Sequence, residues 1–248
     1  MNDLEMLKLC KGVQNNSDVS GWKTLHQYET VSQNKQFNAK VYQKGNTIVL
    51  AFAGTNVFEQ SDLKSDIKIF MSEIPNQFWE AKKMYDTINL RYPNANIVFT
   101  GYSLGGGISN LLSYYTGNPS VAIAPIGVKH IAKAHPGVFR YDDSNITTYG
   151  RRGDGFFNPF SRGLDNQSGK IYVIPDLEKN IKHSGRQWVD NHFLHNYPLN
   201  VLNSAKLYKK PTKATGYAAN INENMKYPPN HIFTREEIDQ MSNRSEEH

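Results

Sequence analysis

The sequence predicts an α/β fold in which helices flank a mostly parallel sheet. Apolar β-type runs alternate along the chain with segments that carry apolar residues at helical spacing. A second observation is the run from Ala95 to Thr100, which leads into Gly101-Tyr102-Ser103-Leu104-Gly105 and then into an apolar segment. A strand, a Gly-x-Ser-x-Gly turn and a helix in that order predict a nucleophile elbow, in which a strained serine is held at the end of a strand.

Length and charge limit the classes of protein to consider. The 248 residues correspond to a single domain spanning 1–248. The net charge of +5 is small and dispersed, which argues against a nucleic-acid partner and suits an anionic lipid surface. Cys10 is the only cysteine, so no intrachain disulfide can form, as is usual in a reducing compartment.

Neither a signal peptide nor a membrane-spanning segment is expected. Residues 1–5 lack the basic and apolar regions of a secretory signal, and no apolar run approaches transmembrane length. We therefore expect a chain that is cytoplasmic as synthesised, and any export would need a route without a removable signal.

The first half of the chain predicts a helix, a hairpin and a second helix. Leu4, Leu7 and Leu9 form a weak helical pattern. Residues 39–42 and 47–52 predict two strands that turn at Lys44-Gly45-Asn46. The second of these strands is apolar on both faces, as a central strand is. Apolar residues at helical spacing then predict a helix over 77–90.

The second half predicts strands on either side of the elbow helix. They cover residues 96–100, 121–128, 146–149 and 170–175, with a loop over 150–169. The segment 200–248 is a C-terminal extension without catalytic signal. Its Thr234-Arg235-Glu236-Glu237 is a capping box for a last short helix ending near Met241.

A serine nucleophile requires a histidine base and a carboxylate. In this fold class both follow the serine along the sequence, the carboxylate first and the histidine after it. Asp154 comes just after the strand 146–149 and is the first choice for the acid, with Asp176, after the strand 170–175, as the alternative. Candidates for the base follow Asp154 in the sequence; they are His183, His192, His195 and His231.

An oxyanion hole needs two backbone donors. One is the N–H of Leu104, the residue after the nucleophile. The other is expected in the loop after an earlier central strand, where Gly54-Thr55 stands. We assign the N–H of Thr55, with its hydroxyl as a further donor.

Three blocks of this sequence resemble the class 3 lipase family of the α/β-hydrolase superfamily, over about residues 22–199. Residues 48–55 are similar to the family's apolar strand and Phe-Arg-Gly-Thr, with Ala53 in place of arginine. Residues 96–107 resemble its Gly-His-Ser-Leu-Gly-Gly-Ala elbow, with Tyr102 for histidine and Gly107 for alanine. A histidine five residues before a tyrosine matches His192 and Tyr197, which favours His192 over His195 as the base.

The resemblance implies a serine carboxylic ester hydrolase, a lipase or phospholipase of lipid degradation, that needs neither metal nor organic cofactor. Ser103, Asp154 and His192 would form the triad. The family often holds a lid after Gly-Thr, which maps to Val57–Pro75; a packed amphipathic helix is the alternative there. The partner would be a lipid or membrane-surface substrate, within metabolism or as a delivered toxin. The competing hypothesis is a non-catalytic binding module that keeps the elbow as a scaffold.

Overall fold

Nine strands of the chain form one sheet in the computed structural model, which describes residues 2–31, 37–54, 73–157, 163–176 and 191–208. Their spatial order is β1-β3-β4-β5-β6-β7-β8-β9, and β2 also pairs with β3. The strands from β4 to β8 are parallel, while β1, β2, β3 and β9 add antiparallel pairs at the two edges. The strands are β1 Lys23–Thr24, β2 Thr30–Val31, β3 Asn38–Lys44, β4 Thr47–Phe52, β5 Asn96–Tyr102, β6 Ser120–Ile123, β7 Ile146–Arg151, β8 Lys170–Ile174 and β9 Lys206–Leu207.

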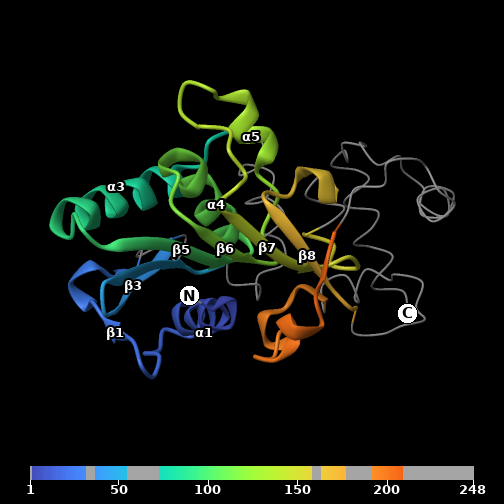
Figure 1. Ribbon diagram of the computed structural model, residues 1–248, viewed down its shortest axis with the longest axis horizontal. Coiled ribbons are helices and arrows are strands. Elements are labelled where there is room, and N and C mark those ends of the chain that lie inside the picture. The colour runs from blue at the N-terminus through green and yellow to red at the C-terminus, as the bar shows by residue number, and fades with distance from the viewer. Residues whose placement is uncertain (1, 32–36, 55–72, 158–162, 177–190, 209–248) are drawn as a thin grey trace, which may run out of the picture.

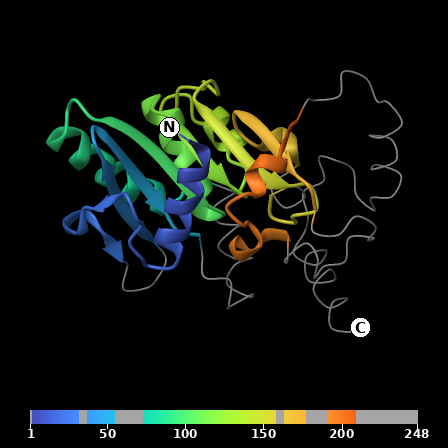
Figure 2. The ribbon, with the colours of Figure 1, turned by 60° about the horizontal axis from the view of Figure 1, so that its bottom comes forward.

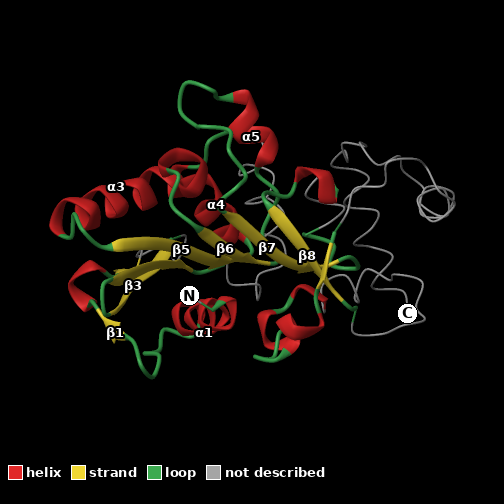
Figure 3. Cartoon of the chain, in the orientation of Figure 1, coloured by secondary structure: helices red, strands yellow, loops and turns green. Residues whose placement is uncertain are grey.

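Helices cover both faces of this sheet (Figure 1). The described helices are α1 Asp3–Gln14, α3 Asn76–Arg91, α4 Leu104–Thr116 and α5 Lys129–Ala134, with 3₁₀ turns η1 His26–Tyr28, η2 Leu164–Asn166, η3 Leu194–Asn196 and η4 Val201–Ser204. Figure 3 shows α3, α4 and α5 on one face and α1 on the other, together with the turns η3 and η4. The predicted fold class, a mostly parallel α/β sheet of the α/β-hydrolase type, is confirmed by this arrangement.

The central strand β4 shows how the sequence produces two cores. Ile48, Leu50 and Phe52 point into the cluster formed with α3 and α4, while Val49 and Ala51 point into the cluster formed with α1. All five side chains are fully buried. Because successive side chains of a strand face opposite sides, a strand covered on both faces must be apolar at every position.

The N-terminal helix packs directly on the sheet, although its sequence pattern is weak. The side chain of Asn2 caps α1 by accepting the N–H of Leu4 at 2.9 Å. Met6, Leu9 and Cys10 of α1 are buried against the sheet. Figure 2 shows the helix lying along the sheet surface beside the central strands.

Several strands differ in length from those that the sequence predicts, and β6 shows the largest difference. The apolar run 121–128 is wrong as a strand beyond Ile123, because Ala124 takes a positive φ of 44° and ends β6. Ile126 and Val128 are still fully buried, which explains their apolar character. In contrast, β7 continues to Arg151, two residues further than predicted.

Several expectations lie outside the described residues. They concern most of the segment 57–75, a helix near Met241, and His183 and His231. Within the described ranges, no helix combines the length and the apolar character that crossing a membrane requires.

Candidate active site

The serine-bearing turn between β5 and α4 is a strained elbow. Ser103 has φ 54° and ψ −119°, a conformation that non-glycine residues rarely adopt. The neighbouring glycines are required by space. A Cβ on Gly105 would lie 2.2 Å from the carbonyl oxygen of Phe52, and one on Gly101 would lie 2.3 Å from the main chain of Gly105. The sequence pattern therefore reflects a turn with no room for side chains on either side of the serine.

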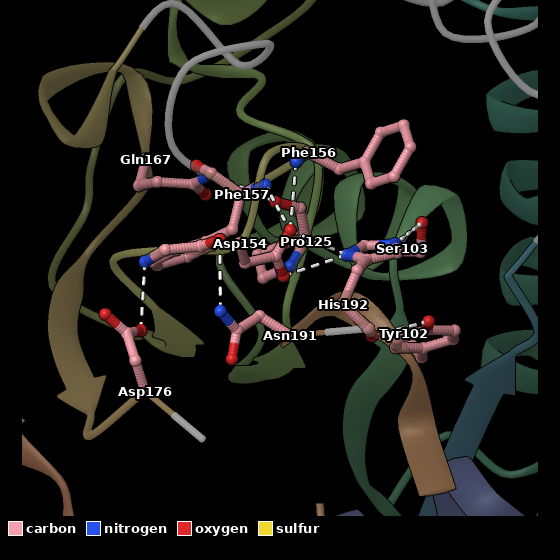
Figure 4. A network of polar contacts seen from close by, with 11 residues as sticks. Tyr102, Ser103, Pro125, Asp154, Phe156, Phe157, Gln167, Asp176, Asn191 and His192 are labelled. Carbon is pink, nitrogen blue, oxygen red and sulfur yellow. Dashed lines mark hydrogen bonds and ion pairs between the residues drawn. The ribbon is translucent and has the colours of Figure 1, made fainter. Parts of the chain in front are cut away.

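A continuous hydrogen-bonded chain links Ser103, His192 and Asp154 (Figure 4). The Nε2 atom of His192 lies 2.8 Å from Oγ of Ser103. Its Nδ1 atom lies 2.8 and 3.0 Å from the two carboxylate oxygens of Asp154. All three residues are at most 1% exposed. With Nδ1 facing the carboxylate, Nδ1 carries the proton and Nε2 is free to accept one from the serine.

The main chain around Asp154 fixes its carboxylate. Oδ1 accepts the N–H groups of Phe156 and Phe157 at 2.9 and 3.0 Å. Asp176, the alternative acid, instead accepts the N–H of Gly153 at 2.9 Å, so it contacts the loop that carries Asp154 and not the imidazole. The structure thus brings Asp154 to the histidine, as the sequence predicts, and places Asp176 one step further away.

The histidine that contacts both Ser103 and Asp154 is His192. Its imidazole is flanked by the rings of Phe156 and Tyr102, with centroids 4.6 and 5.1 Å away. His195, the alternative base, lies in the turn η3, where it is exposed and stacks on Phe193 at 5.3 Å. The pair of candidates is therefore separated by geometry: one is buried against the serine and the other faces solvent.

One of the two predicted oxyanion donors can be located. Leu104 is the first residue of α4, so its N–H has no carbonyl partner within the helix. Thr55 lies outside the described residues, but the preceding Gly54 abuts the elbow: a Cβ on it would be 3.1 Å from Cβ of Ser103. The N–H of Gly54 donates to Oε1 of Gln14 at 2.9 Å, so this donor is already engaged.

Sequence reasoning missed two residues around the site. The first is Arg151, which is 4% exposed and donates to the carbonyl oxygens of Pro175 and Asn196, while its guanidinium stacks over the ring of Tyr197. It therefore ties the end of β7 to the segments on both sides of residues 177–190. The second is Tyr102, whose hydroxyl donates to the carbonyl of His192 at 2.7 Å. Neither contact has a local sequence signal, because each joins residues far apart in the chain.

No group of three or more His, Cys, Asp or Glu side chains that could hold a metal ion occurs in the part of the chain that the structure describes.

Comparisons with solved structures give several low-similarity matches, among them fungal lipases. Lipase from Rhizomucor miehei, in complex with its propeptide, is 15% identical with a TM-score of 0.46; the match covers 69% of this chain and 66% of that one, just under two thirds of its length. A triacylglycerol lipase from Penicillium expansum is 14% identical with a TM-score of 0.47, covering 76% and 86%. Lipase II from Rhizopus niveus is 18% identical with a TM-score of 0.46, covering 69% and 77%.

No curated protein matches the chain significantly. A family profile described as phospholipase-like, the Tle-like phospholipase domain, matches residues 6–156. The match is more than half of the chain and includes both Ser103 and Asp154. The resemblance to a lipase-type family is thereby confirmed, and the chain belongs to the Tle-like phospholipase domain family.

Proposed function

We propose that this protein is a serine carboxylic ester hydrolase that cleaves acyl esters of lipids through a covalent acyl-enzyme. The observation that carries the proposal is the buried chain from Ser103 through His192 to Asp154, with 2.8 Å at each of its two links. A serine hydroxyl is a poor nucleophile at neutral pH, and a histidine at hydrogen-bond distance is what activates it.

In the first half-reaction, Oγ of Ser103 attacks the ester carbonyl while Nε2 of His192 takes the hydroxyl proton. The resulting tetrahedral intermediate carries its negative charge on the former carbonyl oxygen. When the intermediate collapses, the bond to the alcohol oxygen breaks, and His192 returns the proton to that oxygen. In the second half-reaction a water molecule, deprotonated by His192, attacks the acyl-enzyme and releases the fatty acid and Ser103.

Two further groups have supporting roles. Asp154 holds the Nδ1 proton of His192 and stabilises the imidazolium that forms during both steps. The oxyanion is held by the N–H of Leu104, with Thr55 as the second donor. The assignment of Thr55 is supported by its neighbour Gly54, which lies against Ser103 while its own N–H donates to Gln14.

The family and the charge support one substrate class. The family is described as phospholipase-like, which supports an acyl ester of a phospholipid. The net charge of +5 favours approach to an anionic membrane surface over approach to a neutral oil droplet. We therefore propose that glycerophospholipids in anionic bilayers are cleaved faster than triacylglycerol emulsions.

Two measurements test this function. The first compares turnover of p-nitrophenyl esters, and labelling by a fluorophosphonate probe, for wild type and Ser103→Ala. Loss of both in the variant is expected, with labelling of wild type at Ser103. The second follows fatty-acid release from phosphatidylglycerol vesicles and from triacylglycerol emulsions.

Matched histidine variants separate the two candidate bases. His192→Ala is expected to abolish labelling, whereas His195→Ala, which removes an exposed ring, should retain it. Equal ester turnover for wild type and Ser103→Ala would rule out Ser103 as nucleophile. A folded wild type that the probe does not label would instead favour the non-catalytic binding module.

A further inference from the structure

Tyr102 occupies an unusual place between the nucleophile and the base. It is the last residue of β5, directly before Ser103, and it is 2% exposed. Its hydroxyl donates a 2.7 Å hydrogen bond to the main-chain carbonyl of His192, while its ring lies 5.1 Å from the imidazole at an interplanar angle of 31°. Figure 4 shows the two side chains next to each other. One side chain therefore contacts both the backbone and the ring of the base.

The backbone of His192 lies outside the sheet, so no strand pairing holds it. Ser103 is held by the end of β5 and the start of α4, and Asp154 follows β7 closely. For the segment 191–192, the polar contacts to the rest of the protein include the side chain of Asn191, which donates to the carbonyl of Gly153 at 3.2 Å, and the Tyr102 hydroxyl. Of these two, only the hydroxyl ties the histidine to the strand that carries the nucleophile.

The same ring also borders the proposed oxyanion loop. A Cβ on Gly54 would lie 2.8 Å from Cδ1 of Tyr102 and 3.0 Å from its carbonyl oxygen. The tyrosine thus fills the space from the end of β4 to the histidine. A change in its position would shift both Gly54 and His192, which lie on opposite sides of Ser103.

Resting on the proposed function, we infer that Tyr102 is a positioning residue, which sets the distance between His192 and Ser103 by holding the histidine backbone through its hydroxyl. The class 3 lipases that this sequence resembles carry a histidine at this position. In this protein the tyrosine that replaces it has the role of holding His192. Burial, together with the charge of Asp154, raises the pKa of the Tyr102 phenol well above its usual range, so the hydroxyl keeps its proton and remains a donor at every pH at which the enzyme would work.

The effect of losing the hydroxyl can be stated as a rate. Tyr102→Phe keeps the ring but leaves a buried carbonyl of His192 without its donor. A shift of about 1 Å between catalytic groups costs up to ~100-fold in rate, so we expect kcat to fall about 10- to 100-fold. KM should stay within about twofold, because the hydroxyl is directed at the protein and contributes no substrate contact.

The test measures kcat per active site, counted by titration with the fluorophosphonate probe. A merely structural role would lower the number of titratable sites and leave kcat per site unchanged, whereas mispositioning lowers kcat per site and the rate of labelling together. Tyr42→Phe is the matched control: Tyr42 is also fully buried on the same side of the sheet, and its hydroxyl also donates to a main-chain carbonyl, that of Ser17 at 3.2 Å. It should retain wild-type kcat per site.

A second variant restores the donor. An enzyme with p-aminophenylalanine at position 102 keeps an N–H in place of the O–H and should regain kcat per site to within a few-fold of wild type. Tyr102→Phe with wild-type kcat per site, or an aminophenylalanine enzyme with low kcat per site despite full titration, would overturn the inference. Neither outcome can be confused with failure of the proposed function, in which wild type itself would show no labelling of Ser103.

Discussion

The strained backbone of Ser103 predicts an inverted order of stability for two variants that lack its hydroxyl. Ser103→Gly and Ser103→Ala both remove the hydroxyl and its contact with His192, so that loss cancels when they are compared. They differ because glycine adopts φ 54° and ψ −119° without steric cost, whereas alanine keeps the strain of the native serine. The glycine variant should therefore be the more stable one.

The magnitude follows from three contributions. The ψ angle places Ser103 outside the left-handed helical region, so its strain lies toward the upper end of the usual range, about 3 kcal/mol. Glycine loses about 1 kcal/mol through the greater entropy of its unfolded chain. Removal of a buried methyl group costs a further ~0.8 kcal/mol. Together, these contributions make the free energy of unfolding of the glycine variant about 1 kcal/mol higher than that of the alanine variant. This corresponds to a melting temperature roughly 2–4 °C higher for a chain of this length.

Urea unfolding followed by circular dichroism measures this difference, with thermal melts as a second readout. Ser109 provides the control pair, because it is a buried serine inside α4 with ordinary helical geometry. There, glycine should be less stable than alanine by about 1 kcal/mol. An alanine variant at position 103 that is as stable as the glycine variant, with the expected order at Ser109, would refute the reasoning about strain.

Three further predictions concern the acid, the elbow and the buried thiol. Asp154→Asn should lower kcat about 10⁴-fold in ester hydrolysis by favouring the wrong tautomer of the histidine, whereas Asp176→Asn keeps an oxygen for the N–H of Gly153 and should stay near wild type. Gly105→Ala forces a Cβ to 2.2 Å from a carbonyl and should cost about 3 kcal/mol in urea unfolding. Burial raises the pKa of Cys10 from 9.0 to about 12. The unfolded thiol therefore loses its proton first, stability falls as pH rises above 9, and Cys10→Ser should remove up to about 1.4 kcal/mol per pH unit of that slope.

The fold could be predicted where the chemistry is local. The hairpin of β3 and β4 turns at Gly45, which has a positive φ of 58°, and β4 is apolar at every position because both of its faces are covered. The strand prediction for residues 121–128 is wrong beyond Ile123 because these residues are apolar on account of their burial and not because they are extended. A strand and a buried loop give the same pattern there, and the positive φ of Ala124 cannot be read from an alanine.

In the candidate site, too, residues with a local sequence signal can be predicted and the others cannot. Ser103 is marked by glycines that the turn itself requires, so its place could be predicted from a few adjacent residues. Asp154 is predicted by its position after a strand, a weaker signal that Asp176 also satisfies. His192 is predicted over His195 only through a family spacing, because nothing local distinguishes a buried histidine from an exposed one three residues away.

The contacts that hold these groups together have no local signal at all. Tyr102 reaches the carbonyl of His192 across 90 positions of sequence, and Arg151 reaches that of Asn196 across 45. In the sequence alone, Tyr102 is a departure from a motif and weakens the case for an enzyme. In the fold, the larger side chain spans the distance to the segment that carries His192. A substitution inside a motif therefore has to be judged by what its side chain touches, because the same change that removes one family contact can supply another.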